Sequence, residues 1–292
     1  MKFKSKKPQY EYLRKKWISR HRASEESLWE KHGQSFKQLA LGSLGGLMIF
    51  SSPPQLLSLQ KQSNLLVSKD DAIKGYDQNV LLALQLKDKL PEKVRSLSPQ
   101  EETEVTGTLS VNFGFKVTPE LSGVRLNRNY GLIGGEQHLY RYPGDSLYAH
   151  AGSAADWAKY GSSGIAPGLG AWGYFASSKE SFTEIDQQRE KYYLAIQTFL
   201  APGFAENVAK YRDFFKFRKM LIVNPQTGQA VVAVIGDSGP SEWTGKHLGG
   251  SPEVMDVLGL AEGPRKGAVL YFFIDDPEDK VPLGPVKVKN EA

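Results

Sequence analysis

The chain has 292 residues, 40% of them hydrophobic, with 13 Tyr, 14 Phe and 5 Trp, which excludes a wholly disordered protein. It has no cysteine, so disulfides, thiolate catalysis and cysteine-ligated zinc are excluded. Residues 1–37 hold 11 Lys and Arg against 4 Asp and Glu, a balance of +7, whereas the rest of the chain carries −2. The basic charge therefore does not indicate nucleic-acid binding by the folded part, because a basic footprint must lie on the binding face.

The first predicted element is a signal segment at residues 38–53. Residues 39–52 read LALGSLGGLMIFSS, 14 residues without a charge, with a basic arm before them and two prolines after them. This order is typical of a signal segment, and the run is short for a bilayer span. Its three glycines disfavour the alternative of a buried core helix. The stretch therefore predicts a signal or signal-anchor segment.

This segment determines the expected location of the protein. The positive side of such a segment stays in the cytoplasm, so residues 1–37 are expected to be a basic cytoplasmic arm. That arm forms either a basic amphipathic helix on an anionic membrane or a solvated tail. The remaining chain is expected outside the cell, held at the cell membrane or secreted after cleavage. The expected partners include the membrane, through residues 38–53, and no nucleic acid.

Residues 54–104 are predicted to form a helical stalk or linker. Residues 77–90 (DQNVLLALQLKDKL) place apolar residues among polar ones in a helical pattern. Residues 96–104 (SLSPQEETE) have the composition of a linker.

Residues 105–292 are predicted to form a β-rich α+β domain outside the membrane. Residues 105–117 (VTGTLSVNFGFKV) alternate as a strand does. Residues 181–220 look helical and predict a helical insertion, with Thr183 and Asp186 as a capping pair.

A glycine-rich stretch, residues 161–173, precedes this insertion. It lacks the Gly-Lys-Ser/Thr ending of a phosphate-binding loop, so it does not predict a nucleotide site. We expect no cofactor.

The strongest strand pattern in the domain is a hairpin. Residues 220–223 are apolar, residues 229–235 (QAVVAVI) are apolar after the first, and Asn-Pro-Gln-Thr-Gly between the two runs is a turn sequence. The second strand ends at Gly236-Asp237-Ser238-Gly239-Pro240. The elements expected after it are a short helix that begins at Ser251 and strands at residues 268–274 and 286–289.

This order of elements resembles a double-psi β-barrel, and within it the rare lipoprotein A-like and expansin-like group. That group has a Val-x-Asn-x-x-x-Gly turn, a valine-rich strand, Asp-x-Gly-Pro, and a Gly-Arg-hydrophobic-Asp-Leu-Ser element before Leu-Gly. The matching positions here lie between residues 220 and 274: Val223-Asn224 with Gly228, Asp237 with Gly239-Pro240, Gly245-Lys246 with Ser251, and Leu258-Gly259. Ala171-Trp172-Gly173-Tyr174 is similar to the aromatic strand of the group. The resemblance implies a double-psi β-barrel that acts on cell-wall glycan.

The chain departs from the group at two positions. Gly249 stands where the group has a second Asp, and the His that the group carries before the hairpin has no clear match. A weaker similarity to fungal-type chitosanases has the same gap, because their Gly-Glu-x-Ser element is matched only by Gly249-Gly250-Ser251. Both similarities imply glycan-strand chemistry and leave the second catalytic group unassigned.

Asp237 is the foremost catalytic candidate. An Asp at a strand end beside a groove can protonate a glycosidic oxygen if partial burial raises its pKa. Hydrolysis needs a second carboxylate, whereas a lytic transglycosylase can use one acid/base group for both steps. The alternative is that Asp237 is only a turn residue, since Asp-Ser-Gly-Pro has turn chemistry.

The other candidates lie near Asp237 in the sequence or are aromatic. His247 and Glu253 are the possible catalytic partners, although Glu253 also suits the first turn of a helix. No set of His, Asp and Glu has metal-ligand spacing, so no metal site is expected. The candidate substrate-binding residues are Trp172, Tyr174, Ser238, Trp243 and Ser251.

The sequence leaves three functions open. The first is an exported glycan-cleaving enzyme, either a lytic transglycosylase or a glycosidase. The second is a non-catalytic, expansin-like glycan-binding module, and the third is an envelope structural protein that keeps the barrel as a scaffold.

Overall fold

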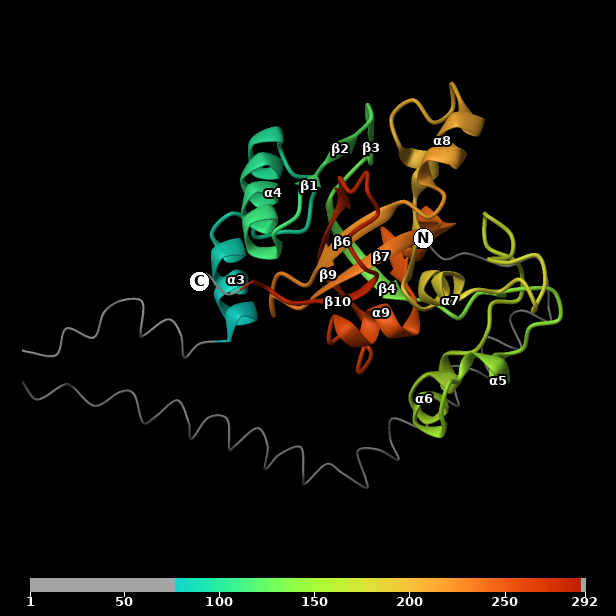
Figure 1. Ribbon diagram of the computed structural model, residues 1–292. Helices are drawn as coiled ribbons and strands as arrows, with labels where there is room; N and C mark the ends of the chain where they lie inside the picture. Colours follow the sequence, from blue (N-terminus) through green and yellow to red (C-terminus); the bar gives the residue numbers. More distant parts are fainter. Residues whose placement is uncertain (1–76, 290–292) are drawn as a thin grey trace, which may run out of the picture. The chain divides into compact units, whose positions relative to one another are not determined.

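The computed structural model describes residues 77–289, and its centre is a closed β-barrel of six strands (Figure 1). Each barrel strand pairs with two others, in the order β9, β4, β8, β5, β7, β6 and back to β9. The strands are β4 (Tyr130–Gly135), β5 (Tyr193–Ile196), β6 (Lys219–Val223), β7 (Ala230–Ser238), β8 (Leu248–Gly250) and β9 (Lys266–Ile274). The structure is therefore the expected β-barrel-containing α+β domain.

The segment expected to be a signal, residues 38–53, and the basic arm before it lie outside the described residues. Within residues 77–289, no helix combines the length and the apolar character that a bilayer crossing requires.

Two of the six barrel pairings are parallel. They join β4 to β8 and β5 to β7, and the other four pairings are antiparallel. The predicted hairpin is confirmed as β6 and β7, with Val223 opposite Ala230. Its turn is held by Asn224, whose side-chain oxygen accepts from the backbone N–H of Gln226 and whose amide donates to the carbonyl of Leu258.

Alternation along the barrel strands separates two apolar cores. One core fills the barrel and contains Leu194, Ile222, Ile235, Leu248 and Tyr271. The other lies on the outer side of β6, β7 and β9, where the helices α3 (Gln78–Lys87) and α4 (Pro99–Phe113) cover it (Figure 1). Because successive side chains of a strand point to opposite faces, strands buried on both sides read as continuous apolar runs.

The region before the barrel corrects two sequence predictions. Residues 105–117 were expected to be a strand, but α4 covers residues 105–113, because Ser98 and Glu101 form a capping box and Pro99 occupies the first turn, and only Val117 belongs to a strand. The expected domain boundary between residues 104 and 105 falls inside this helix. Since α3 and α4 pack on the barrel, residues 77–104 belong to the folded domain and are not a separate stalk.

The predicted helical insertion is only partly helical. The capping box of Thr183 and Asp186 is confirmed at the start of α7 (Glu184–Lys191). The chain then enters the barrel as β5, so the apolar residues from Tyr193 to Ile196 form a strand and not a helical face. Tertiary packing has overridden the helical spacing here, since all four residues of β5 are buried.

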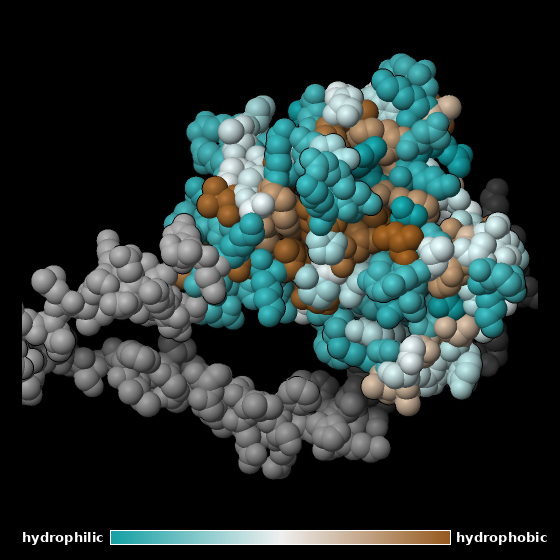
Figure 2. Space-filling model, viewed as in Figure 1, coloured by the Kyte–Doolittle hydropathy of each residue, from teal (hydrophilic) through white to brown (hydrophobic). Residues whose placement is uncertain are grey.

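The remaining elements are short and surround the barrel. These remaining elements are β1 (Val117–Thr118), β2 (Glu120–Leu121), β3 (Val124–Arg125), α5 (Leu147–His150), α6 (Ala154–Tyr160), η2 (Gly161–Ser163), η3 (Thr198–Leu200), α8 (Val208–Phe215), η4 (Glu242–Thr244), α9 (Pro252–Val257) and β10 (Gly284–Val286). The expected helix from Ser251 is confirmed as α9, while the expected final strand at residues 286–289 lies earlier, as β10. Figure 2 shows hydrophilic residues around the visible face and hydrophobic residues over its middle, where the barrel strands lie.

Candidate functional site

A bulge between β5 and β7 sets the direction of Asp237. Leu194 pairs with Ile235, but the next residue, Ala195, pairs with Asp237, so Gly236 is the extra residue on β7. Leu194 and Ile235 both point into the barrel, and the bulge turns Asp237 to the outer side together with Ala195. A Cβ at Gly236 would lie 2.6 Å from the Cβ of Tyr193, which is why glycine is required there.

The carboxylate of Asp237 is anchored through one of its two oxygens. Oδ1 accepts from the backbone N–H of Ala171 at 2.6 Å and from that of Ser238 at 2.7 Å. Among residues 77–289, nothing donates a hydrogen bond to Oδ2. Burial raises the pKa of Asp237 above its usual value, and the two backbone donors offset only part of that rise. The geometry is therefore that of an oriented carboxyl group whose protonated form is favoured.

The glycine-rich stretch at residues 161–173 supplies one of the two donors to this carboxylate, the backbone N–H of Ala171. Trp172, next to Ala171, donates its indole N–H to the carbonyl of Ile235 at 3.0 Å and packs against the barrel core. The approach is close at Gly170, where a Cβ would lie 3.4 Å from the Asp237 carboxyl carbon. The loop predicted to lack a phosphate-binding sequence therefore lies directly on the Asp237 corner.

A second carboxylate lies on the same outer side, two strands away. Ala195 pairs with Asp237 on one side and with Gly249 of β8 on the other, so the three residues form a row across the sheet. A Cβ at Gly249 would lie 2.2 Å from Oε1 and 2.3 Å from Cγ of Glu136, so the Glu136 side chain fills the space that a side chain at 249 would take. With strands about 4.8 Å apart, the backbones of Asp237 and Gly249 are about 10 Å apart.

The charge of Glu136 is compensated locally. Lys246 places its Nζ 2.7 Å from Glu136 Oε1, and both side chains are partly exposed. Gln197, which follows β5, donates to the carbonyls of Pro240 and Lys246 and so ties both ends of the loop between β7 and β8. Sequence reasoning did not single out Glu136, because the signal for it is the glycine opposite it and not a motif of its own.

The other predicted residues around this corner divide into exposed and structural positions. Trp243 in η4 is 88% exposed, and Tyr174 is 38% exposed, so both present aromatic faces to solvent. Ser238 shares a 2.6 Å hydrogen bond with Thr198. Ser251 is fully buried, caps α9 at Val254 N, and donates to the carbonyl of Lys191.

His247 is held against β4. Its Nδ1 lies 2.8 Å from the backbone N–H of Leu132, and its Nε2 lies 2.9 Å from the guanidinium of Arg128. Both neighbours are donors, and burial together with the positive charges of Arg128 and Lys266 lowers the pKa of His247. Among the charged neighbours of its ring are cations and no carboxylate, which suits an unprotonated imidazole.

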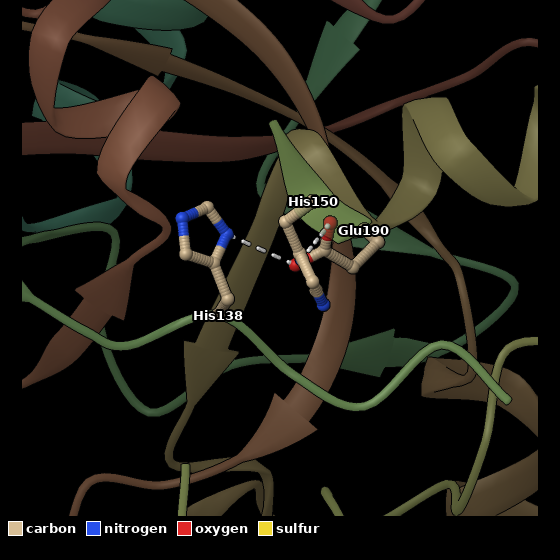
Figure 3. Close-up of side chains that lie close together, drawn as sticks. All are labelled: His138, His150 and Glu190. Carbon is tan, nitrogen blue, oxygen red and sulfur yellow. Dashed lines mark hydrogen bonds and ion pairs between the residues drawn. The ribbon is translucent and has the colours of Figure 1, made fainter. Parts of the chain in front are cut away.

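A separate cluster of titratable side chains is buried beside the barrel. His138, His150 and Glu190 have ligand atoms that all lie within 4.8 Å of one another (Figure 3). The Glu190 oxygens face both imidazoles, with Oε1 3.3 Å from His138 Nδ1 and Oε2 3.3 Å from His150 Nδ1. All three side chains are 3% exposed or less.

Two further charged residues support His150. Its Nε2 lies 2.8 Å from Asp145 Oδ2, and Asp145 also accepts from the guanidinium of Arg141 at 2.8 and 3.1 Å. Burial lowers the pKa of His150, but the hydrogen bonds and charges of Asp145 and Glu190 outweigh this and raise it to about 9. Burial also disfavours the charged form of Glu190 and so raises its pKa, but the two imidazoles outweigh this and bring the pKa down to about 2. Mutual compensation therefore keeps this buried network charged.

The cluster opens onto a pocket that also contains Glu253. Glu253, in the first turn of α9, is buried, and burial raises its pKa to about 7. Its Oε2 has no hydrogen-bond partner in the described part of the chain. The pocket measures about 310 Å³ with its open mouth included, and its lining includes His138, His150, Trp157, Tyr160, Lys191 and Glu253. Of the predicted catalytic residues, Glu253 thus lies in this pocket and Asp237 in the outer corner.

The sequence search for metal-ligand spacing missed this cluster because 52 residues separate His138 from Glu190. Glu190 lies on α7, His150 at the end of α5 and His138 in the loop after β4, so only the fold brings them together. The one sequence signal is compositional, since two of the five histidines fall within the loop that follows β4.

No protein-family model matches the chain, and no curated protein matches it in sequence. The assignment of function therefore rests on the geometry of the described residues.

Proposed function

We propose that the protein is an exported enzyme that cleaves cell-wall polysaccharide, with Asp237 as the general acid. The observation that carries this proposal is the Asp237 carboxyl itself, anchored through Oδ1 alone with its pKa raised by burial. A carboxyl group whose pKa is raised by burial and that leaves one oxygen unengaged can protonate a glycosidic oxygen.

The proposed fold class is the double-psi β-barrel. Six strands in a closed ring, the parallel pairs β4–β8 and β5–β7, and Asp237-Ser238-Gly239-Pro240 at the end of β7 support it. The resemblance to the rare lipoprotein A-like and expansin-like group, drawn from short motifs, gives the substrate class. In this proposal the exposed rings of Trp243 and Tyr174 stack on sugar faces.

We further propose that Glu136 is the second carboxylate of the reaction. The resembled families carry that acid at position 249, and here the Glu136 side chain occupies the space beside Gly249. The backbones of Asp237 and Gly249 are about 10 Å apart, which leaves room for the water that an inverting hydrolase holds between two carboxyl groups roughly 6.5–9.5 Å apart. Glu136 then acts as the base that activates the water.

The direct test uses the full-length chain on peptidoglycan and on chitosan. Asp237→Asn should reduce release of soluble fragments by roughly 10²- to 10⁴-fold, the usual contribution of a general acid. The variant keeps the shape of the site, because the amide oxygen of Asn can accept from both Ala171 and Ser238. Glu242→Gln, in the exposed loop of η4, is the matched control and should leave the rate unchanged.

The outcomes separate the three functions. Fragment release that is lost in Asp237→Asn and kept in Glu242→Gln supports the enzyme. Pull-down on insoluble glycan without release overturns it in favour of the expansin-like binding module. Absence of both binding and release from the wild-type chain favours an envelope structural protein.

A double replacement tests the place of the second carboxylate. Glu136→Gln should remove hydrolysis, and Glu136→Ala combined with Gly249→Asp should restore part of it, because the smaller side chain vacates the space that the new Asp needs. Full activity of Glu136→Gln with products that carry anhydro ends would show a lytic transglycosylase, which uses Asp237 alone.

A further inference from the structure

We propose that His138, His150 and Glu190 bind a divalent transition-metal ion of the zinc class. This inference is independent of the glycan-cleaving function, since the cluster lies in a different pocket from Asp237. Two imidazoles and one carboxylate are a ligand set that zinc accepts in proteins, with a fourth position left for water.

The two distances from Glu190 to the imidazoles fit shared ligation better than a charge-assisted hydrogen bond, whereas the ligand atoms of the whole cluster lie within 4.8 Å of one another, so binding one zinc draws the two imidazoles closer together. Charge-assisted N–H···O bonds are about 2.7–2.9 Å long. His150 makes such a bond at 2.8 Å to Asp145. The contacts of His138 Nδ1 and of His150 Nδ1 with the Glu190 carboxylate are longer, and both measure 3.3 Å. Two ligand atoms at about 2.0–2.1 Å from a tetrahedral zinc are about 3.3 Å apart.

One of the ligand atoms has no other partner. His150 Nδ1 is buried, it lies 3.3 Å from Glu190 Oε2, a long contact with poor hydrogen-bond geometry, and no other described atom bonds to it. An orphaned buried nitrogen is costly, and a metal ion at this point satisfies it. Figure 3 shows both imidazoles beside the Glu190 carboxylate.

The surroundings of His150 match those of a metal-ligating histidine. Such a histidine usually gives its second nitrogen to a carboxylate, which fixes the ring and raises its basicity. Asp145 does so at Nε2, and Arg141 in turn holds Asp145. Residues that hold the ligands are thus present in addition to the ligands.

The pocket supplies an access path and a neighbour for a metal-bound water. His138 and His150 both line it, and so does Glu253, whose buried Oε2 has no partner among residues 77–289. A water bound to the metal at the fourth position, on the pocket side, would donate a hydrogen bond to Glu253 Oε2. The chemical class of the ligand is therefore a divalent cation with one exchangeable water.

The experiment measures metal binding to the untagged full-length chain. After chelator treatment, we expect one Zn²⁺ per chain by calorimetry and a visible cobalt spectrum of the tetrahedral type when Co²⁺ is added. Glu190→Gln and His138→Ala should abolish both signals, and Asp145→Asn should weaken Zn²⁺ binding about 10- to 100-fold.

The chain offers its own controls, because it has only five histidines. His247→Gln and the double variant His21→Gln with His32→Gln should bind Zn²⁺ as the wild-type chain does. Failure of the wild-type chain to bind Zn²⁺ or to give the cobalt spectrum would overturn the proposal without any variant. Undiminished binding in a Glu190→Gln chain with a native circular dichroism spectrum would overturn it as well.

Discussion

Asp237 is a partly buried carboxylate and Glu190 a fully buried one, and the protein shifts their pKa values in opposite directions. Asp237 has only backbone N–H donors, so burial dominates and raises its pKa. Glu190 is more deeply buried, but two imidazoles lower its pKa to about 2. The presence of cationic neighbours therefore decides the protonation state, and burial alone does not. The first environment suits a proton donor, and the second suits a permanently ionised group.

The largest expected effect comes from breaking the charge compensation around Glu190. Asp145→Ala leaves Arg141 and His150 buried without their partner and should lower the free energy of unfolding by about 3–5 kcal/mol. Urea denaturation of the metal-free chain at pH 7 measures it. The matched control is Lys116→Ala, which removes the exposed ion pair with Asp275 and should cost less than about 1 kcal/mol. A loss below 1 kcal/mol for Asp145→Ala would show that the network does not hold this region together.

The outer side of the barrel between Asp237 and Gly249 is expected to respond to a steric change as well. Gly249→Ala places a methyl group where the partly exposed Glu136 side chain lies, so that side chain must move aside and the cost by urea denaturation should be about 1 kcal/mol, the low end for overpacking. Glu136→Ala should relieve this cost in the double variant, since it removes the Cγ and carboxylate that the methyl group meets. Additive effects of the two replacements would show that the side chains do not share one space.

The two regions also differ in how far the sequence predicts them. The hairpin, the corner after β7 and the helix that begins at Ser251 were predicted, because turn residues and caps act locally. Helix α4 was mistaken for a strand, since its Val and Thr residues favour strands and its capping box was overlooked. β5 was mistaken for a helix, because its burial depends on strands far away in the chain. The His138, His150 and Glu190 cluster has no local signal, and Glu136 becomes visible only beside Gly249.

The smallest expected effect on stability is that of Asp237→Asn, and the amide variant of Glu190 in the metal-free chain provides the direct comparison. Because the folded-state pKa of Asp237 is raised above 3.8, its ionised form destabilises the fold, and this penalty grows as pH rises through that pKa. Asp237→Asn should therefore match the wild type near pH 3 and be at least as stable at pH 7. Glu190 has the opposite sign: its pKa falls from 4.5 to about 2, so its contribution is present above pH 4.5 and is lost as pH falls toward 2. Glu190→Gln should accordingly be less stable than the wild type at pH 7 and approach it in acid. Urea denaturation between about pH 3 and pH 7 measures how the stability difference between each variant and the wild type changes with pH. Slopes of the same sign for the two variants would contradict the opposite pKa shifts of Asp237 and Glu190.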